Sequence, residues 1–564
     1  MKVNALQSDI PIVQQVVNTC YSYQIKHIVI SPGSRNAPMA ISFSNHPFFE
    51  CYSIVDERCA AFFAMGIAQQ LNKPVALICT SGSALLNYYP AISEAFYSQI
   101  PLIVLSADRP VELVDIGDGQ TIRQSKVFAN HVVAEVDLLN NIVFNKDLLL
   151  ANDILLKKAI SSSINYNLPT HINIPLYEPL YNTVKVKLKD QFKVALPTKS
   201  KLFSLNKEVL HIWNTVEKIL VLVGVLPPNS VEQLLLEQLL ENPAVVIMSE
   251  TTSNLHHPRI ITGIDKLIAA FNENEKQSFQ PQVLLTFGGM VVSKKIKVFL
   301  RKYQPKVHWH VDEQRAYDTY FCLSNHFKTT INNFIAQLPR NNQQLNQSLN
   351  YQKKWLQEFQ QRRSGHQQYL KKIPYCDLKV FSEIFNCLES NICLQLSNSS
   401  TIRYSQLFDI SANLEVFCNR GTSGIDGSSS TAIGAASILH KPTVLITGDL
   451  SFLYDSNALW NNYIPQNFKI IVINNSGGGI FRILPGDKSA NYFEQFLETK
   501  HNHTAQHLAR MYNFEYLKGD EKNFIDVIEQ FVQKTGNIIL EIFTPSTIND
   551  VILLKYFTEI REIC

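Results

Sequence analysis

Short runs of apolar residues alternate along this chain with segments whose apolar positions recur at helical spacing. In the first third the apolar runs are residues 27–33, 51–57, 75–82, 101–110 and 170–176, and the segments with helical spacing are 11–25, 58–71 and 83–97. Strands that alternate with amphipathic helices are typical of a parallel sheet with helices on its faces. Residues 1–185 are therefore predicted to form an α/β domain.

The same alternation returns twice further along the chain. The apolar runs are residues 218–224, 244–250, 282–289 and 306–313 in the middle third, and 392–399, 415–421, 442–449, 468–475 and 536–543 in the last third. The poorly patterned residues 185–201 predict a linker, and the polar residues 341–370 predict a helix that leads into the last domain. We expect three α/β domains with mostly parallel sheets, at residues 1–185, 186–370 and 371–564.

Composition agrees with a large buried interior and excludes some partners. A chain of 564 residues is too long for a single core. Charged residues make up 18% and hydrophobic residues 46%, which favours extensive burial and subunit contacts. The net charge of +3 gives no general electrostatic attraction for nucleic acid, so any cationic site must be local.

The cysteines and the N-terminus indicate the interior of the cell. The ten cysteines include no C-x-x-C pair, which is typical of reduced residues in a cytosolic protein. The first residues, MKVNALQSDIPIV, lack the regions of a signal peptide, and no run approaches the roughly 18 apolar residues of a membrane span. We expect a soluble cytoplasmic protein without membrane insertion.

Residues with oxygen donors follow two of the predicted strands in the last third. Asp449 ends one apolar run, and Asn474 and Asn475 end the next. A carboxylate, an amide oxygen and a backbone carbonyl suit magnesium, whose remaining positions go to water and phosphate oxygens. We predict that Asp449, Asn475 and the carbonyl oxygen of Gly477 bind magnesium, with manganese as an alternative ion.

Three glycines, Gly477–Gly479, come directly after this second strand. Their backbone can approach a phosphate closely. A lone Gly-Asp pair would be an ordinary turn, but the 24 residues between Asp449 and Asn474 resemble the signature of thiamine diphosphate enzymes, in which the metal holds the diphosphate of the cofactor. The last third is therefore expected to bind thiamine diphosphate.

Polar residues also end four predicted strands of the first third, at 31–35, 56–58, 80–83 and 107–110. Any one of these would be a turn or a helix cap, but ligands of parallel sheets bind beyond the carboxyl ends of the strands. Thiamine chemistry needs a carboxylic acid beside N1′ of the aminopyrimidine ring, and Glu57 suits that role. The alternative is a surface ion pair with Arg58.

Further candidates follow strands in the middle and last thirds. Lys294 and Lys295 begin a predicted helix, where the alternative is a solvated face. The run GTSGIDGSSST after Arg420 offers backbone amides to a phosphate, or is a flexible loop. His503 and His507 have the i, i+4 spacing of a zinc site, but no third ligand is visible, which favours surface histidines.

Six segments resemble the family of 2-succinyl-5-enolpyruvyl-6-hydroxy-3-cyclohexene-1-carboxylate synthases of menaquinone biosynthesis. They are SPGSRNAP, DERCAAFFAMGIA, TSGSALLNYYPA, ADRPVELVDIGDGQTIRQ, NRGTSGIDG and GDLSFLYDSNAL. The resemblance implies an N-terminal pyrimidine-binding domain, a central domain and a C-terminal diphosphate-binding domain. It implies a thiamine diphosphate and magnesium enzyme that decarboxylates 2-oxoglutarate and transfers the succinyl group to isochorismate.

The resemblance also implies the roles of individual residues. Glu57 would be the catalytic acid, and the bulky Ile425 would support the bent cofactor. The implied cofactor contacts are Glu57, Ile425, Asp449, Asn475, Gly477, Gly478, Ile480 and Phe481. The implied substrate contacts are Ser34, Arg35, Arg109, Gln120, Lys294, Lys295, Ser399, Arg403, Arg420, Phe481 and Leu484.

Charge counting agrees with these substrates. They bring four carboxylates, of which one leaves as carbon dioxide, and Arg35, Arg109, Lys294, Lys295, Arg403 and Arg420 are six local cations. Lysine lacks the planar fork of arginine, so two-point binding of a carboxylate is not expected at Lys295. Because the predicted acid and metal site lie in different domains, the family arrangement implies a homodimer or homotetramer with the active site between subunits.

Two other functions fit parts of the pattern. A thiamine diphosphate carboligase of the acetolactate synthase type would use pyruvate, but a small acceptor needs fewer cations. A regulatory protein that binds the cofactor without turnover would not need Glu57 together with the predicted metal site. Activity with pyruvate alone would favour the first alternative, and release of carbon dioxide from 2-oxoglutarate would exclude the second.

Overall fold

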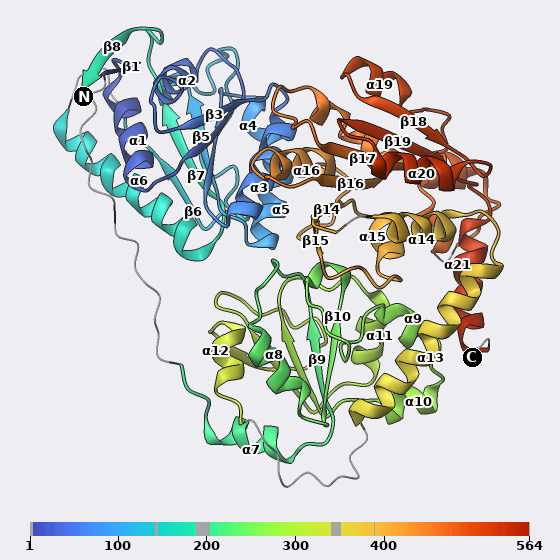
Figure 1. Cartoon of the computed structure of the whole chain (residues 1–564). Coiled ribbons are helices and arrows are strands. Elements are labelled where there is room, and N and C mark those ends of the chain that lie inside the picture. The colour runs from blue at the N-terminus through green and yellow to red at the C-terminus, as the bar shows by residue number, and fades with distance from the viewer. Residues whose placement is uncertain are drawn as a thin grey trace. The chain divides into compact units, whose positions relative to one another are not determined.

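The computed structural model describes residues 4–140, 145–187, 194, 203–339, 351–388, 390–484 and 486–562. The chain forms two compact units. One consists of Met1–Thr198, Gly421–Thr443 and Ser451–Phe468, and the other of Lys199–Arg420, Val444–Leu450 and Lys469–Cys564. Three larger sheets lie within these units (Figure 1), one in each predicted α/β domain.

The first unit contains a six-stranded parallel sheet. Its order is β3–β2–β4–β5–β7–β6, with β2 (His27–Ile30), β3 (Glu50–Ser53), β4 (Val75–Cys79), β5 (Leu102–Asp108), β6 (Ala134–Asp137) and β7 (Thr170–Pro175). A separate antiparallel pair joins β1 (Asn4–Ser8) to β8 (Thr183–Lys187). The five predicted strands of the first third are confirmed, and β1, β6 and β8 were not predicted.

Helices cover both faces of this sheet. Figure 1 shows α1 (Pro11–Ser22) beside α6 (Lys146–Tyr166), and these pack with α2 (Ala37–Ser44) on one face. The others are α3 (Glu57–Leu71), α4 (Ser83–Asn87), α5 (Tyr89–Ser98) and the short η1 (Val111–Leu113). The single helix predicted at 83–97 is two helices that meet at Tyr88, and Pro90 stands in the first turn of the second, where a missing N–H costs nothing.

Helix α16 (Ser428–Ala436) from the last third packs against α3 within the first unit. The two helices approach closely because each carries a glycine at the crossing. A Cβ atom on Gly434 would lie 2.0 Å from the carbonyl oxygen of Phe63, and one on Gly66 would lie 2.1 Å from that of Thr431. The crossing thus depends on these two glycines.

We expect Gly434→Ala to destabilise the fold, because the methyl group would force the two backbones apart. Overpacking of this kind costs about 1–3 kcal/mol in the free energy of unfolding. Thermal or urea unfolding measures it, with Gly119→Ala as control, since a Cβ atom there meets nothing within 4 Å. Equal stability of the two variants would contradict the close crossing.

The middle third forms a five-stranded parallel sheet in the second unit. Its order is β10–β9–β11–β12–β13, with β9 (Ile219–Val223), β10 (Val245–Ser249), β11 (Val283–Phe287), β12 (Val307–Val311) and β13 (Leu323–Phe327). One face packs against α7 (Lys207–Thr215), α8 (Gln233–Leu240) and α12 (Ile331–Ala336). The other packs against α9 (Ile264–Ile268), α11 (Lys294–Lys302) and α13 (Tyr351–Lys372), and η2 (Thr251–Ser253) and α10 (Glu273–Ser278) complete this part.

All four predicted strands of the middle third are confirmed. The polar helix predicted at 341–370 is confirmed for residues 351–370, which belong to α13, and residues 341–350 lie outside the described residues. The predicted linker at 185–201 begins within β8, and most of it lies outside the described residues.

The last third forms a six-stranded sheet of order β15–β14–β16–β17–β19–β18. The strands are β14 (Ile392–Leu396), β15 (Leu414–Cys418), β16 (Thr443–Gly448), β17 (Phe468–Asn474), β18 (Glu515–Gly519) and β19 (Ile538–Phe543). The helices in this part are α14 (Asp377–Cys387), α15 (Ser400–Ser405), α17 (Asp449–Tyr454), α18 (Ile480–Ile483), α19 (Gln506–Met511), α20 (Phe524–Gln533) and α21 (Asn549–Glu562), with η3 (Ser456–Leu459) and the π-helical η4 (Phe493–Glu498). The five predicted strands are confirmed, and β18 was not predicted.

The strand orders point to where each sheet offers a binding crevice. In each of the three larger sheets the chain runs from the first strand to one neighbour and then crosses to the other side, so the order reverses between β2 and β4, β9 and β11, and β14 and β16. Ligands of parallel sheets bind beyond the carboxyl ends at such points. Seven of the predicted site residues follow these strands, namely Ser34, Arg35, Lys294, Lys295, Ser399, Arg403 and Asp449.

The described helices include none that is both long enough and apolar enough to span a lipid bilayer. The cysteines of the described part, from Cys20 to Cys418, form no disulfide bonds with one another. Cys564 lies outside the described residues.

Candidate functional site

Asp449 follows β16 as the first residue of α17, and its side chain is buried, with 4% exposed. One carboxylate oxygen accepts a hydrogen bond from the amide of Leu450 at 2.7 Å. The other accepts from the amide of Gly477 at 2.9 Å. The structure therefore brings two of the predicted metal ligands into direct contact.

Asn475 follows β17 and is 8% exposed. Its side-chain nitrogen donates to Asp377 at 3.1 Å, and Asp377 also accepts from the hydroxyl of Thr544 at 2.6 Å. Burial raises the pKa of Asp377 to about 6, although these hydrogen bonds oppose the shift. Because Asp377 takes the amide nitrogen of Asn475, the amide oxygen is the atom left to bind a ligand.

These residues fit a hard divalent cation. The side-chain oxygen of Asn475 is buried and has no hydrogen-bond partner in the described part of the chain. A buried acceptor without a partner is costly, and a cation beside the Asp449 carboxylate would satisfy it. Gly477 has φ +148°, and a Cβ atom there would lie 2.6 Å from the carbonyl oxygen of Glu498, so this position of the loop requires glycine.

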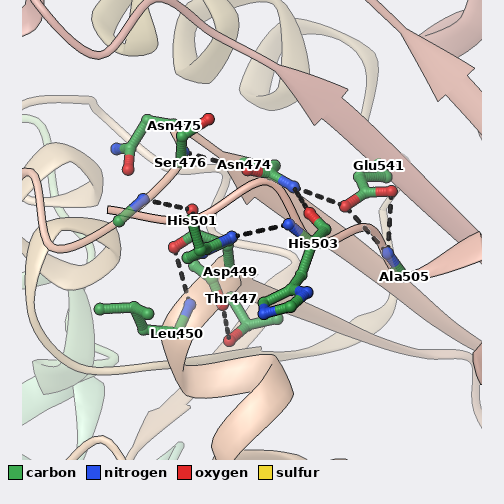
Figure 2. Close-up of polar contacts among 12 residues, drawn as sticks. Thr447, Asp449, Leu450, Asn474, Asn475, Ser476, His501, His503, Ala505 and Glu541 are labelled. Carbon is green, nitrogen blue, oxygen red and sulfur yellow. Dashed lines mark hydrogen bonds and ion pairs between the residues drawn. The ribbon is translucent and has the colours of Figure 1, made fainter. Parts of the chain in front are cut away.

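His501 also lies at this site, although no sequence pattern marked it as a candidate. Its Nε2 atom is 3.4 Å from a carboxylate oxygen of Asp449, and its backbone amide donates to the carbonyl oxygen of Ser476 at 3.1 Å. The contact with Asp449 raises the pKa of His501. Figure 2 shows His501 between Asp449 and His503, whose amide donates to Nδ1 of His501.

A buried carboxylate fixes the loop that carries His501. Glu541 accepts from the side-chain nitrogen of Asn474 at 2.8 Å and from the amide of Ala505 (Figure 2), as well as from the hydroxyl of Tyr516 at 2.7 Å. Asn474 in turn donates to the carbonyl oxygen of His503 at 3.0 Å. Asn474 thus ties the loop to the end of β17, while Asn475 faces Asp377.

Glu57 is the first residue of α3, at the carboxyl-end rim of the first sheet. Its nearest polar partner is the side-chain amide of Asn87, at 3.5 Å. The predicted alternative, an ion pair with Arg58, is not found in the described residues. Arg58 instead donates to the carbonyl oxygen of Tyr454 at 2.7 Å and lies over the ring of that residue.

Three other predicted residues of the first unit lie at the same rim. Hydrogen bonds hold two of them, and the third is exposed. Arg35 is 5% exposed and donates to the carbonyl oxygen of Leu176 and to Glu178. Arg109 donates to the carbonyl oxygen of Gly119 at 2.9 Å and pairs with Asp118 at 3.3 Å. Ser34 is exposed.

Gln120 belongs to the loop that Arg109 contacts. Its side chain is exposed and its backbone has φ +55°. Its carbonyl oxygen lies beside Gly82, where a Cβ atom would be 3.2 Å away. The loop 119–120 therefore lies against the end of β4.

Four predicted cations of the second unit are gathered around two carboxylates, Glu250 and Asp265. Lys295 and Arg403 both influence the pKa of Asp265, and Arg420 influences that of Glu250. Burial lowers the pKa of Arg403, and the nearby Arg420 lowers it further. Lys294 acts on the pKa of Lys297, which Glu250 and Arg420 also affect, so the four cations share one region.

Hydrogen bonds hold two of these cations at the ends of strands. Arg403 donates to the carbonyl oxygen of Ser399 at 2.7 Å, and Arg420 donates to the side-chain oxygen of Asn398 at 2.6 Å. Lys295 differs from the others, because its ammonium group lies over the ring of Phe557, 4.3 Å from the centroid.

Three sequence profiles of thiamine pyrophosphate enzymes match the chain in order. The N-terminal TPP-binding domain matches residues 11–131, the middle domain 191–392, and the C-terminal TPP-binding domain 399–542. Each matched segment contains strands of one of the three larger sheets.

Curated relatives match over almost the whole chain. Proteins of Flavobacterium psychrophilum, Flavobacterium johnsoniae and Christiangramia forsetii are 52%, 50% and 49% identical to it. The matches cover 97%, 98% and 98% of this chain and 98%, 99% and 100% of the relatives, and each relative is named 2-succinyl-5-enolpyruvyl-6-hydroxy-3-cyclohexene-1-carboxylate synthase. The chain belongs to this synthase family. It is therefore a thiamine diphosphate enzyme.

The apolar residues that the synthase family led us to expect at the cofactor lie on loops and a short helix. Ile425 is 37% exposed, and its carbonyl oxygen accepts from the hydroxyl of Ser451 at 2.7 Å. Ile480 and Phe481 begin α18, Leu484 follows it, and the amide of Gly478 donates to the carbonyl oxygen of Glu498.

The run GTSGIDGSSST after Arg420 was expected to offer backbone amides to a phosphate, but three of these amides have a partner in the chain itself. The amides of Gly421 and Thr422, each at 2.6 Å, and that of Ser423, at 3.3 Å, donate to the buried carboxylate of Glu94. The run after Arg420 thus binds a carboxylate of its own chain through these three amides. Glu94 was not predicted, because nothing in the local sequence links it to a loop more than three hundred residues later.

The alternative that His503 and His507 bind zinc is wrong. His503 precedes α19 and His507 lies within it, so the i, i+4 spacing does not place both on one helix. Both are exposed, and the described residues contain no group of three or more His, Cys, Asp or Glu residues that could hold a metal ion.

We expect Asp377→Asn to weaken binding of the divalent metal about tenfold, since residues that orient metal ligands typically contribute 10–100-fold to affinity. In this variant the new side-chain NH₂ group at position 377 can face the NH₂ group of Asn475. The repulsion between the two groups would let the oxygen of Asn475 turn away from the metal site. Titration of thiamine diphosphate binding with magnesium measures the change, with Glu521→Gln as an exposed control. An unaltered magnesium requirement would show that Asp377 does not orient Asn475.

Proposed function

We propose that this protein decarboxylates 2-oxoglutarate and transfers the succinyl group to isochorismate. The products would be 2-succinyl-5-enolpyruvyl-6-hydroxy-3-cyclohexene-1-carboxylate and carbon dioxide, and the step belongs to menaquinone biosynthesis. The observation that carries the proposal is the 52% identity over 97% of the chain to a relative of that name. The cations around Glu250 and Asp265 support substrates rich in carboxylates.

Asp449, Asn475 and the carbonyl oxygen of Gly477 would hold magnesium, with manganese as a substitute. The contact between Asp449 and the Gly477 amide and the unpartnered oxygen of Asn475 support this assignment. Thiamine diphosphate, when bound, supplies the electron sink for loss of carbon dioxide from a 2-oxo acid. Gly478, Ile480, Phe481 and Ile425 would pack against it.

Glu57 would share a proton with N1′ of the aminopyrimidine ring. A carboxyl group that gives and takes a proton at a fixed atom is a general acid-base catalyst. Glu57 lies at the rim of the first sheet, where its contact with Asn87 is long, 3.5 Å, so the carboxylate is available for this role.

The remaining cations would bind and orient substrate carboxylates. Arg403 and Arg420 carry planar guanidinium groups suited to two-point binding, and Lys294 adds a point charge. Ser34, Arg35, Arg109, Gln120, Ser399 and Leu484 are the other proposed substrate contacts, while Lys295 is held over Phe557. Positive charge at the acceptor's carboxylate would stabilise the negative charge that develops during addition.

We also infer a homodimer or homotetramer in which Glu57 of one subunit meets the metal site of another. The acid and the metal ligands belong to different compact units of the chain, which supports a site shared between copies. Because 2-oxoglutarate is a metabolite of the cell interior, the proposal places the enzyme in the cytoplasm.

Product analysis tests the proposal. The protein is incubated with 2-oxoglutarate, isochorismate, thiamine diphosphate and magnesium, and the product is identified by its mass. We expect the succinylated cyclohexene carboxylate and one carbon dioxide per product. A parallel reaction with pyruvate tests the carboligase alternative, and turnover of pyruvate without turnover of 2-oxoglutarate would overturn the proposed donor.

A further inference from the structure

Helix α11 begins with two lysines, which is an unfavourable place for positive charge. The N-terminus of a helix carries partial positive charge, and α11 has no acidic residue in its first turn. Ser293 caps the helix, since its hydroxyl oxygen accepts from the amide of Ile296 at 3.1 Å. A stable local fold alone therefore does not account for Lys294 and Lys295 at this position.

A buried carboxylate from another strand holds the residues directly before the helix. Glu250 follows β10 and is 3% exposed. One of its oxygens accepts from the amide of Val292 at 2.6 Å, and the other from the amide of Ser293 at 2.7 Å. Hydrogen bonds to an ionised acceptor are short and strong, so both oxygens are needed to fix this turn.

A second carboxylate reaches the same turn. Asp265 of α9 accepts a hydrogen bond from the hydroxyl of Ser293. Burial raises the pKa of Asp265, while Ser293, Lys295 and Arg403 lower it. The cap of α11 is therefore held by Glu250 through its backbone and by Asp265 through its side chain.

We propose that Glu250 is a positioning residue whose carboxylate fixes the start of α11 and thereby places Lys294 to bind a carboxylate of the substrate. This inference rests on the proposed function. It assigns a role to a residue that touches neither cofactor nor substrate, and it links substrate affinity to the charge of one buried group.

The electrostatic surroundings make this charge sensitive to pH near neutrality. Burial, with a smaller contribution from Asp265, raises the pKa of Glu250 to about 7, although the two amides and Arg420 oppose the shift. The other groups that face it are Lys297 and Tyr320, whose own pKa values respond to Glu250. Below this pKa the carboxyl carries a proton, and one oxygen can no longer accept from an amide.

The protonation of Glu250 predicts how KM changes with pH. As pH falls from about 8 to about 6, Glu250 becomes neutral, the turn loosens, and the KM for a carboxylate substrate rises up to about tenfold. In Glu250→Gln the second oxygen is an NH₂ group at every pH, so KM is raised about tenfold at high pH and this component of the pH dependence is lost.

A double-mutant cycle tests whether Glu250 acts through Lys294. KM and kcat are measured for wild type, Glu250→Gln, Lys294→Ala and the double variant, at pH values between about 6 and 8. We expect KM to change more than kcat in Glu250→Gln, and the double variant to be no worse than Lys294→Ala alone. Independent effects that multiply in the double variant, or an unchanged pH profile, would overturn the proposal.

Two further variants serve as controls. Glu237→Gln removes a carboxylate that pairs with His257 at 3.3 Å and is partly exposed, and it should leave KM and its pH profile unchanged. If Glu250→Gln does not fold, Glu250→Asp keeps the charge but shortens the side chain, and it is expected to raise KM while retaining the pH dependence. A wild-type KM in Glu250→Asp would count against the proposal.

Hydrogen exchange separates this inference from the proposed function. If wild type makes no product from 2-oxoglutarate and isochorismate, the proposed function fails, but exchange of the amides in residues 288–296 can still be compared by mass spectrometry. Glu250→Gln should exchange faster than wild type there and equally elsewhere. Equal exchange in this segment would show that Glu250 does not fix the turn.

Discussion

In the Asp449→Ala variant we expect binding of thiamine diphosphate to lose its dependence on magnesium. Asp449 supplies the only carboxylate among the three proposed ligands, and it also accepts from the amide of Gly477, so its loss removes a charge and frees the loop. The apparent affinity for the cofactor in the presence of magnesium should fall at least about 100-fold. Calorimetric titration with and without magnesium measures it.

The matched control for Asp449 is Asp526→Ala, which removes an exposed carboxylate of α20. It should bind the cofactor like wild type. A magnesium-dependent affinity that survives in Asp449→Ala would mean that the metal is held elsewhere. Without cofactor the variant should still unfold in one cooperative transition, with a midpoint lowered by the loss of the hydrogen bonds from the amides of Leu450 and Gly477.

The Glu57→Gln variant should bind thiamine diphosphate normally and still lose activity. The amide keeps the size of the side chain but cannot exchange a proton with N1′ of the aminopyrimidine. Acid-base catalysis typically contributes about 10²–10⁴ in rate, so kcat should fall by that factor while cofactor affinity changes less than about threefold. Exchange of the C2 proton of the bound cofactor, followed by NMR, should slow in parallel.

Glu50→Gln is the matched control for Glu57, because Glu50 lies at the amino end of β3, at the other end of the strand that Glu57 follows, and contacts Lys26, His27 and Tyr52 there. Its activity should remain at the wild-type level. Undiminished C2 proton exchange in Glu57→Gln would contradict the proposed role. Mixing this variant with Asp449→Ala should restore about a quarter of the activity if two subunits share each site.

The buried strands could be predicted because they read as continuous apolar runs. β4 and β9, for example, are buried at every position, as expected for parallel strands covered on both faces. The strands that were missed are short and partly exposed. β8, with the sequence TVKVK, and β13, with LSNHF, include no buried residue and gave no apolar run.

The candidate site could be predicted only where its residues follow strands in a recognisable pattern. Asp449, Asn475 and Gly477 met this condition, and the structure places the first and third in contact. Asp377 and Glu250 did not, because each acts on a loop that is distant in the sequence. A buried acid whose partners are backbone or side-chain amides has no signature in its own neighbourhood.

The partners of the predicted cations also could not be predicted from the local sequence. Composition and spacing marked Lys294 and Lys295 as one pair, yet only the packing of α21 explains why Lys295 lies over Phe557. Likewise, the glycines and hydroxyl residues after Arg420 looked suited to phosphate, and only the fold supplies Glu94 as the acceptor of their amides. Local sequence identifies donors and acceptors, but the tertiary structure pairs them.

A crystal structure of the protein grown with thiamine diphosphate and magnesium tests the central claim most directly. The account predicts a magnesium ion bound to Asp449, Asn475 and the carbonyl oxygen of Gly477, with the diphosphate on its open side and the aminopyrimidine ring hydrogen-bonded to the Glu57 carboxylate of a neighbouring subunit. A metal bound by other residues, or a pyrimidine ring without contact to any Glu57, would contradict it.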